Sequence, residues 1–519
     1  MPSVRWLLAI VFCGFSLNLA AEDCPARPEN GSVVNDPYSI SSQNGVLRAQ
    51  FILAHSVDQA GYTHYCYKYN ASGQIVEAPT LRLNPGDHLE LDVLNRIEDK
   101  DTMKMKMVMP KAQGQICGDG GNATLDSTNV HFHGLNVPPV CHQDDVIETL
   151  IQPGSPGFHF SIQIPTTEPP GLYWYHPHVH GFTEFQVNGG AAGAIVVEGM
   201  EKYRPEVQGL AERVFVIRQQ YLVPWIPGPY RLTLNYVTAP SIGEPPVIQM
   251  QSGQKQFWRV ANASLQDFLE LQVVDNDKPE KLEIIALDGY PLAITREEKT
   301  ILIPPAGRAE FIVTAPAAGD NAVFYTQSYS TGPTGNADLA GVLANIQVTD
   351  KSQASPMPKA PAPASVAGLK FSDLGDVKVT AERKLYFSEE FGGTNGPIQF
   401  YITVEGQKQR VFEANEKPVI TTKVGAVEDW TIENRALETH AFHMHQIHFK
   451  VIEVDGKPVG QSELRDTVAI PYWDGKGPYH SVKVRMDFRD PTIAGTFLFH
   501  CHILLHEDLG MMHKILVEP

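Results

Sequence analysis

Three ten-residue segments of this 519-residue chain share one pattern, and that repeat limits the folds open to it. The segments are GDHLELDVLN (86–95), GQKQFWRVAN (253–262) and GAVEDWTIEN (425–434). Each begins with Gly, carries Leu or Trp five residues later and Val or Ile seven residues later, and ends with Asn. The copies begin about 170 residues apart, a period that predicts three homologous domains.

The rest of the sequence predicts β structure in all three domains. Short alternating runs such as HLELDVLN, AEFIVTAP and HKILVEP are separated by clusters of Gly, Pro and Asn, which is typical of β-sandwiches and β-barrels. We therefore predict an all-β chain with a Pro/Ala/Ser-rich linker before the third domain. The expected parts are domain one at 22–200 with an insertion at 96–129, domain two at 201–351, the linker at 352–368 and domain three at 369–519.

The N-terminus has the layout of a secretory signal peptide. Residues 1–21 contain Arg5, an apolar run and small residues at Ala20 and Ala21. The apolar run is shorter than the ~20 residues of a membrane span, and no later segment is apolar enough to cross a bilayer. We predict an exported protein, periplasmic or secreted, with no membrane span. The formal net charge of -18 argues against a nucleic-acid partner.

Four cysteines of the expected mature chain lie apart from the histidine-rich C-terminus: Cys24, Cys66, Cys117 and Cys141. An even number in an exported protein predicts two disulfides. We expect Cys24–Cys66 and Cys117–Cys141, although four cysteines permit three pairings.

Histidines gather in the outer domains, and no His lies between Gly181 and Thr439. The middle domain therefore cannot supply imidazole ligands. Side chains at i and i+2 of a strand share one face, so each His-x-His pair presents two imidazoles together. The four pairs are His131/His133, His176/His178, His443/His445 and His500/His502.

The third domain adds a different ligand set. One Cys thiolate, two imidazoles and a weak axial Met are the ligands of a blue-copper electron-transfer centre, which His440, Cys501, His506 and Met511 match. The eight paired histidines predict a second, all-imidazole site that bridges domains one and three and is large enough for three coppers. Neighbours on a strand face opposite sides, so Cys501 would serve one site while His500 and His502 serve the other.

A structural zinc site closes at four ligands and has no use for ten histidines. Three other histidines near the motifs are predicted not to bind metal. They are His180, His448 and His513, of which His180 is the alternative to His176 as the partner of His178.

The segments HFHG, YWYHPH, HAFHMH and HCHILLHEDLGM resemble the four copper-ligand motifs of the three-domain multicopper oxidases, which include laccases and bacterial cuprous oxidases. The resemblance implies three cupredoxin-like Greek-key domains, four coppers, one-electron oxidation of a donor and reduction of O2 to water. It also implies which residues hold each copper. These are His440, Cys501, His506 and Met511 for the type 1 copper, His131 and His443 for type 2, and His133, His176, His178, His445, His500 and His502 for the type 3 pair.

The resemblance suggests roles for several other groups. His506 would admit electrons from the donor, and Glu507 would deliver protons to the cluster. Asp144 matches an Asp that the family keeps near the cluster, with the adjacent Asp145 as the alternative. Asp466 matches an acid near the blue copper. Monomer is the default state of the family.

The donor is the least determined property. In MKMKMVM (103–109), Met103, Met105, Met107 and Met109 would line one face of a strand. Their thioethers suit Cu(I), but they also suit the packed face of a half-buried strand. We favour a laccase-like oxidase of phenols or aryl amines, with a metal oxidase of cuprous, ferrous or manganous ion as the alternative. A non-catalytic structural or copper-storage role is disfavoured because every ligand motif is intact.

Overall fold

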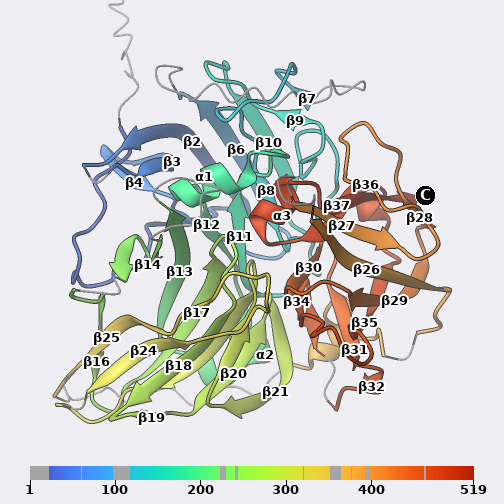
Figure 1. Cartoon of the computed structure of the whole chain (residues 1–519). Helices are drawn as coiled ribbons and strands as arrows, with labels where there is room; N and C mark the ends of the chain where they lie inside the picture. Colours follow the sequence, from blue (N-terminus) through green and yellow to red (C-terminus); the bar gives the residue numbers. More distant parts are fainter. Residues whose placement is uncertain are drawn as a thin grey trace, which may run out of the picture.

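The computed structural model describes residues 23–59, 61–97, 117–221, 230–239, 243–319, 321–350, 364–375, 377–391, 398–460 and 463–519. The expected signal peptide, Met103 to Met109 and most of the expected linker lie outside these residues. The chain is built of three pairs of sheets, coloured blue to cyan, green to yellow, and orange to red in Figure 1. The all-β prediction is confirmed.

Within each pair, the two sheets share one hydrophobic core. The first pair has the strand orders β1 (Ser39–Ser41), β5 (Thr80–Leu83), β12 (Gly193–Val197), β11 (Gly171–His176), β8 (His131–His133), and β10 (Phe158–Gln163), β6 (His88–Asn95), β2 (Val46–Val57), β3 (Thr63–Ala71), β4 (Gln74–Glu77). Between β6 and β10 in the chain, β7 (Cys117–Gly118) and β9 (Thr149–Leu150) pair with each other in a separate two-stranded sheet.

The second and third pairs repeat this arrangement. The second has β15 (Val237–Ala239), β14 (Tyr230–Leu234), β13 (Ala211–Tyr221), β17 (Lys255–Ala263), β23 (Arg308–Thr314), β20 (Leu282–Leu287), β21 (Tyr290–Glu298), and β16 (Val247–Gln251), β25 (Gly341–Thr349), β24 (Ala322–Gln327), β18 (Leu269–Asp275), β19 (Lys278–Pro279), with β22 (Ile301–Ile303) on β18. The third has β27 (Ile398–Val404), β26 (Ala381–Phe391), β29 (Ala426–Asn434), β35 (His480–Phe488), β31 (Phe449–Val454), β32 (Lys457–Pro458), with β33 (Leu464–Arg465) on β31, and β28 (Ile420–Lys423), β37 (Met512–Glu518), β36 (Gly495–Cys501), β30 (His440–Met444), β34 (Thr467–Ile470).

Helices are few and short. They are α1 (Thr183–Gly189), α2 (Met200–Tyr203) and α3 (Leu504–Asp508), with 3-10 turns η1 (Pro205–Val207), η2 (Val366–Gly368) and η3 (Pro491–Ile493). Among the described residues, no helix has the length and apolarity needed to cross a bilayer.

The sequence repeat corresponds to one strand position in each pair. β6, β17 and β29 carry the three copies, and each pairs with a parallel neighbour (β2, β13, β26) and an antiparallel one (β10, β23, β35). The repeated Asn is fully buried in every copy. Its side-chain Nδ2 donates to two backbone carbonyls, at 2.6 and 3.0 Å for Asn95, 2.8 and 3.0 Å for Asn262, and 2.7 and 3.0 Å for Asn434. Because a buried carbonyl without a partner is costly, an Asn at this strand end satisfies two of them.

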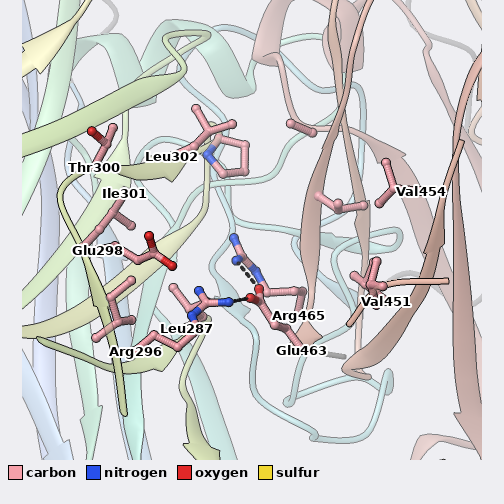
Figure 2. A pocket seen from close by; sticks show the side chains of 15 residues that line it. Leu287, Arg296, Glu298, Thr300, Ile301, Leu302, Val451, Val454, Glu463 and Arg465 are labelled. Carbon is pink, nitrogen blue, oxygen red and sulfur yellow. Dashed lines mark hydrogen bonds and ion pairs between the residues drawn. The ribbon is translucent and has the colours of Figure 1, made fainter. Parts of the chain in front are cut away.

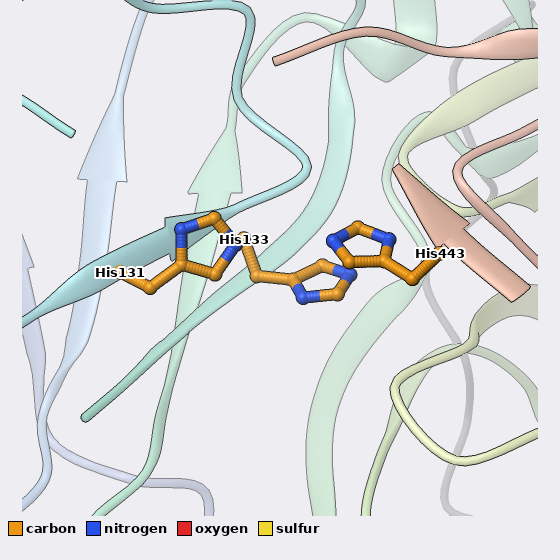
Figure 3. Close-up of side chains that lie close together, drawn as sticks. All are labelled: His131, His133 and His443. Carbon is orange, nitrogen blue, oxygen red and sulfur yellow. The ribbon is translucent and has the colours of Figure 1, made fainter. Parts of the chain in front are cut away.

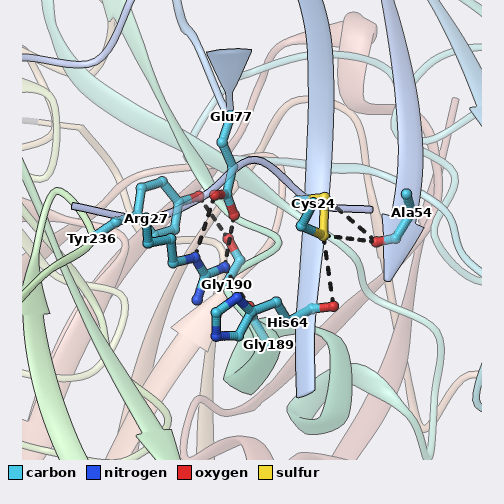
Figure 4. Close-up of a disulfide and its surroundings, with 9 residues drawn as sticks. Cys24, Arg27, Ala54, His64, Glu77, Gly189, Gly190 and Tyr236 are labelled. Carbon is cyan, nitrogen blue, oxygen red and sulfur yellow. Dashed lines mark hydrogen bonds and ion pairs between the residues drawn. A yellow bond between two sulfur atoms is a disulfide. The ribbon is translucent and has the colours of Figure 1, made fainter. Parts of the chain in front are cut away.

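Two disulfides join the four cysteines as expected. Cys24 is bonded to Cys66, 42 positions later in the chain, and Cys117 is bonded to Cys141. Figure 4 shows Cys24 near His64 and Ala54, with the Arg27–Glu77 ion pair close by. The first bond fixes the start of the described chain to β3, and the second fixes the end of the expected insertion to the segment that follows β8.

The second and third pairs meet at a cavity of about 420 Å³ (Figure 2). Arg296 from β21 forms an ion pair with Glu463, and Arg465 contacts both Glu463 and Asp288. These ion pairs join the middle sheets to Glu463 and to Arg465 of β33. Arg465 directly precedes Asp466, which belongs to the histidine centre described next.

Candidate metal centre

The paired histidines meet where the first and third sheet pairs face each other. β8 and β11 are adjacent, with His131 opposite His176, and β30 and β36 are adjacent, with His443 opposite His500. Histidine rings from the first sheet pair stack on rings from the third. His131 stacks on His445 and His133 on His443, each with ring centroids 4.0 Å apart. Figure 3 shows His131 and His133 reaching from β8 toward His443.

All eight paired histidines belong to this cluster. In each of three groups of rings, the nearest nitrogens lie within 4.8 Å of one another, which is the spacing of ligands around a shared ion. The groups are His131, His133 and His443; His133, His176 and His502; and His178, His445 and His500. The sequence prediction that these side chains come together is therefore met for every member.

Burial lowers the pKa of all eight rings, to about 3 for His176 and about 4 for His500. The rings are therefore neutral at physiological pH, and neutral imidazole is the form that binds metal.

Backbone and carboxylate acceptors fix how these rings point. Nδ1 of His176 donates to the carbonyl of Pro177 at 2.9 Å, and Nδ1 of His443 donates to the carbonyl of Asp466 at 2.8 Å. The opposite nitrogens, Nε2 of His176 and of His443, are buried without a hydrogen-bond partner in the described part of the chain. The same is true of Nε2 of His131. Unpaired buried acceptors aimed into one volume are costly unless an ion occupies it, so the residues fit a metal cluster.

A second, smaller centre lies on the other side of β36. The Sγ of Cys501 is 3.6 Å from Nδ1 of His440 and 3.9 Å from Nδ1 of His506. Met511 is fully buried in the same core, and its backbone bonds to both Cys501 and His506. Burial raises the pKa of the Cys501 thiol, so a thiolate here requires a metal to stabilise it. The flanking His500 and His502 belong to the eight-histidine cluster, as strand alternation predicts.

Asp144 and Glu507 both contact the eight-histidine cluster. Both carboxylate oxygens of Asp144 lie 3.0 Å from Nδ1 of His131, while the adjacent Asp145 accepts backbone bonds from Ile147 and Glu148 in a turn. The geometry thus selects Asp144 over Asp145. Glu507 is fully buried, with oxygens 3.4 Å from Nε2 of His178 and 3.3 Å from Nδ1 of His500.

Asp466 corrects an expectation. The sequence suggested an acid near the blue copper, but β34 pairs with β30 so that Thr467 is opposite His443 and Ile470 is opposite His440. Asp466 therefore lies at the His443 end of the strand. Its carboxylate is 3.4 Å from Nε2 of His133 and accepts two bonds from the guanidinium of Arg308.

The ion pair between Arg308 and Asp466 also explains the glycine of the HFHG segment. Gly134 has φ +89°, and a Cβ there would lie 2.6 Å from Nη2 of Arg308 and 2.7 Å from Asp466. A side chain at this position would displace the ion pair. Arg308 comes from the middle sheets, which supply no metal ligand, and no sequence pattern pointed to it.

The environment of His506 also contains residues that sequence reasoning missed. Its ring stacks on Phe400 with centroids 3.9 Å apart, and its Nε2 is 3.6 Å from Glu438. Nε2 of His440 is similarly 3.4 Å from Glu389. The His506 side chain is only 4% exposed, so it does not face an open pocket among the described residues. Of Phe400, Glu389 and Glu438, only Glu438 could have been found from the local sequence, because it lies two residues before His440.

Three histidines predicted not to bind metal pack elsewhere. The ring of His180 contacts Phe412 edge-on, Nε2 of His448 donates to the carbonyl of Asp288, and His513 pairs with Glu416. None of them belongs to a group of metal-binding side chains in the described residues.

The comparisons with known proteins agree on one family. Models described as "Multicopper oxidase" match residues 115–202, 174–352 and 392–519. The multicopper oxidase mco of Staphylococcus aureus is 23% identical over 95% of this chain and 90% of its own length. A laccase of Haloferax volcanii is 25% identical over 75% of this chain and 67% of its own. A solved multicopper oxidase from Campylobacter jejuni, described as a metallo-oxidase, superposes with a TM-score of 0.70 at 21% identity, covering 95% of this chain and 96% of that one.

Proposed function

The chain belongs to the multicopper oxidases, copper-dependent oxidoreductases with O2 as acceptor, and on this premise we propose that it is a laccase-like oxidase of phenolic or aryl-amine donors. The observation that carries the proposal is the buried free thiol of Cys501, whose Sγ contacts two histidines of one centre and which is flanked in the chain by two histidines of the other. We further propose that the domains keep the boundaries expected from the sequence, that the protein is exported, and that it acts as a monomer.

The copper assignment follows the grouping of the side chains. Bound copper at these residues supplies one-electron transfer and the four-electron reduction of O2 to water. We assign type 1 copper to His440, Cys501, His506 and Met511, type 2 to His131 and His443, and the type 3 pair to His133, His176 and His502 on one side and His178, His445 and His500 on the other.

Cys501 and its neighbours form the proposed electron route. The thiolate and the two adjacent imidazoles are consecutive residues, so only backbone separates the two centres. The Nδ1 of His500 donates to the carbonyl of Cys501 at 2.9 Å, which adds a hydrogen bond along the same segment. His506 is the proposed entry point, with the ring of Phe400 stacked over it.

Glu507 is the proposed proton donor for O2 reduction. Burial and the nearby Asp508 raise the pKa of Glu507 well above its usual value, which favours the protonated carboxyl group. A protonated carboxyl within 3.4 Å of two cluster histidines can deliver a proton where O2 is reduced.

Replacing Glu507 with Gln keeps the volume and removes the transferable proton. We expect O2 reduction to slow by about 100-fold, in the range that general acids contribute. Reduction of the type 1 copper by donor under anaerobic conditions should keep its normal rate. Stopped-flow traces with and without O2 measure the two steps separately. An E507Q enzyme that reoxidises at the normal rate would exclude Glu507 from proton delivery.

A metal ion is the second candidate donor, because a carboxyl group lies beside each of the two histidine rings proposed to hold the type 1 copper. Glu389 and Glu438 are nearly buried, with side chains 3% and 10% exposed, and cations such as Fe(II) or Mn(II) favour oxygen ligands. The four methionines of 103–109, which would favour Cu(I), lie outside the described residues.

Oxygen uptake by the copper-loaded enzyme decides between the donors. We expect a phenolic donor to be consumed at least about 10-fold more efficiently than Cu(I) or Fe(II), a difference of ~1.4 kcal/mol in transition-state stabilisation. Joint replacement of Met103, Met105, Met107 and Met109 with Leu should change neither rate. If a metal ion is the better donor, the enzyme is a metal oxidase, and loss of the Cu(I) rate in the Leu variant would identify that ion as cuprous. No uptake with any donor would contradict an oxidase.

A further inference from the structure

Gln446 occupies a backbone conformation that glutamine normally avoids. It follows His445 at the end of β30 and has φ +59°, in the left-handed region where a Cβ is strained. A glycine would adopt this conformation without strain. The side chain is 1% exposed, so the turn lies inside the protein and not at a permissive surface.

The amide of Gln446 is directed at the metal centre. Its Nε2 donates to Oδ2 of Asp144 at 2.5 Å, a bond between residues 302 positions apart that crosses from the third sheet pair to the first. The amide oxygen, Oε1, is buried without a hydrogen-bond partner among the described residues. The residue thus carries two costs, a strained backbone and an unpaired buried acceptor, and within the described part of the chain its side chain makes one polar contact, with Asp144. Strain retained at such a position indicates a functional constraint.

Asp144 in turn determines how His131 points. Its carboxylate lies 3.0 Å from Nδ1 of His131 and accepts the backbone N–H of Phe132 at 2.9 Å, so it fixes both the ring and the strand that bears it. The His131 ring stacks on His445, the neighbour of Gln446 in the chain. Gln446 therefore closes a loop of contacts: it holds Asp144 through its amide and His445 through its backbone, and both of these hold His131.

We propose that Gln446 is a positioning residue for the type 2 copper, acting through Asp144 to aim Nε2 of His131 into the cluster. The proposal rests on the proposed function, because it takes His131 and His443 as the type 2 ligands. Outer hydrogen-bond partners of metal-binding histidines typically contribute 10–100-fold to metal affinity. The aliphatic part of the side chain contributes to packing, but the strained backbone is explained by the amide contact.

Gln446→Gly separates the two roles because it relieves the strain while removing the amide. We expect the copper-free variant to unfold at the same temperature as the parent or at a higher one. In the copper-loaded variant, the type 2 signal in electron paramagnetic resonance should be lost at a chelator concentration about 10-fold lower than in the parent, while the type 1 signal is retained. Gln446→Asn should behave in the same way, since Asn tolerates the left-handed conformation but its amide is one methylene too short to reach Asp144.

Asp277→Gly is the matched control. Asp277 also has a positive φ, of +64°, in the exposed turn between β18 and β19, on the middle sheets. The unfolding temperature of this variant should change in the same direction as that of Gln446→Gly. Its type 2 signal should be lost at the same chelator concentration as in the parent. If Gln446→Gly keeps the parental type 2 resistance, or loses thermal stability without losing type 2 copper, Gln446 is a structural turn residue and the proposal is wrong. If the parent itself shows no type 2 signal, the copper assignment fails instead.

Discussion

Replacing Cys501 with Ser should give a colourless protein that no longer transfers electrons from a donor to O2. The side chain is fully buried and serine is nearly isosteric, so the three sheet pairs should still form. A hydroxyl does not supply the soft thiolate of a blue-copper site, and the route through His500 and His502 then has no starting point. The loss of turnover should exceed the ~10–100-fold that removal of an outer-shell partner costs.

Three measurements check this result on one preparation: visible absorption, copper content and O2 uptake. We expect the Cys501→Ser protein to keep the coppers of the eight-histidine cluster and to lose one copper per chain together with its blue colour. Met511→Leu is the matched control, because it alters the proposed weak axial ligand in the same buried core and should leave the protein blue and active with a shifted potential. A C501S protein that remained blue would place the type 1 copper elsewhere.

The grouping of the candidate ligand side chains was predictable because strand geometry is local. Alternation along β36 assigns His500 and His502 to one face and Cys501 to the other without any knowledge of the fold. The repeat was predictable because the buried asparagines at or beside the ends of β6, β17 and β29 each donate to two equivalent backbone carbonyls, so the same residue recurs at the same strand position. Where a short segment carries the whole physical reason for a residue, the segment alone reveals it.

The supporting residues were not predictable, because their reasons lie far away in the chain. Gln446 is explained by Asp144, 302 positions earlier, and Arg308 by Asp466, 158 positions later. The position of Asp466 itself depends on the register of β34 against β30, which the sequence of either strand alone does not determine. The low exposure of His506 in α3 depends on Phe400, a residue of β27 that has no metal-binding chemistry.

Arg308 makes the metal-free middle sheets part of the centre. It is fully buried, its Nε donates to the carbonyl of Leu172 in the first pair at 3.2 Å, and its Nη1 and Nη2 donate to the carboxylate of Asp466 in the third pair. Asp288 lies 3.7 Å from the same guanidinium and also binds Arg465. The positive charge of Arg308 therefore lies against the carboxylates of Asp466 and Asp288 where all three sheet pairs meet. This ion pairing keeps Asp466 against His133.

Arg308→Met should consequently destabilise the copper-free protein by about 3–5 kcal/mol, the cost of leaving a buried carboxylate without its cation. Calorimetry on the metal-free protein measures the loss, and Lys281→Met, which removes a positive charge from an exposed pair with Glu297, should leave the unfolding temperature unchanged. Arg308→Lys should recover only part of the stability, since an ammonium cannot reproduce the two-pronged contact. If Arg308→Met were as stable as the parent, the middle domain would be a spacer between the copper-binding domains. A large loss means that it is the electrostatic support on which the cluster is assembled.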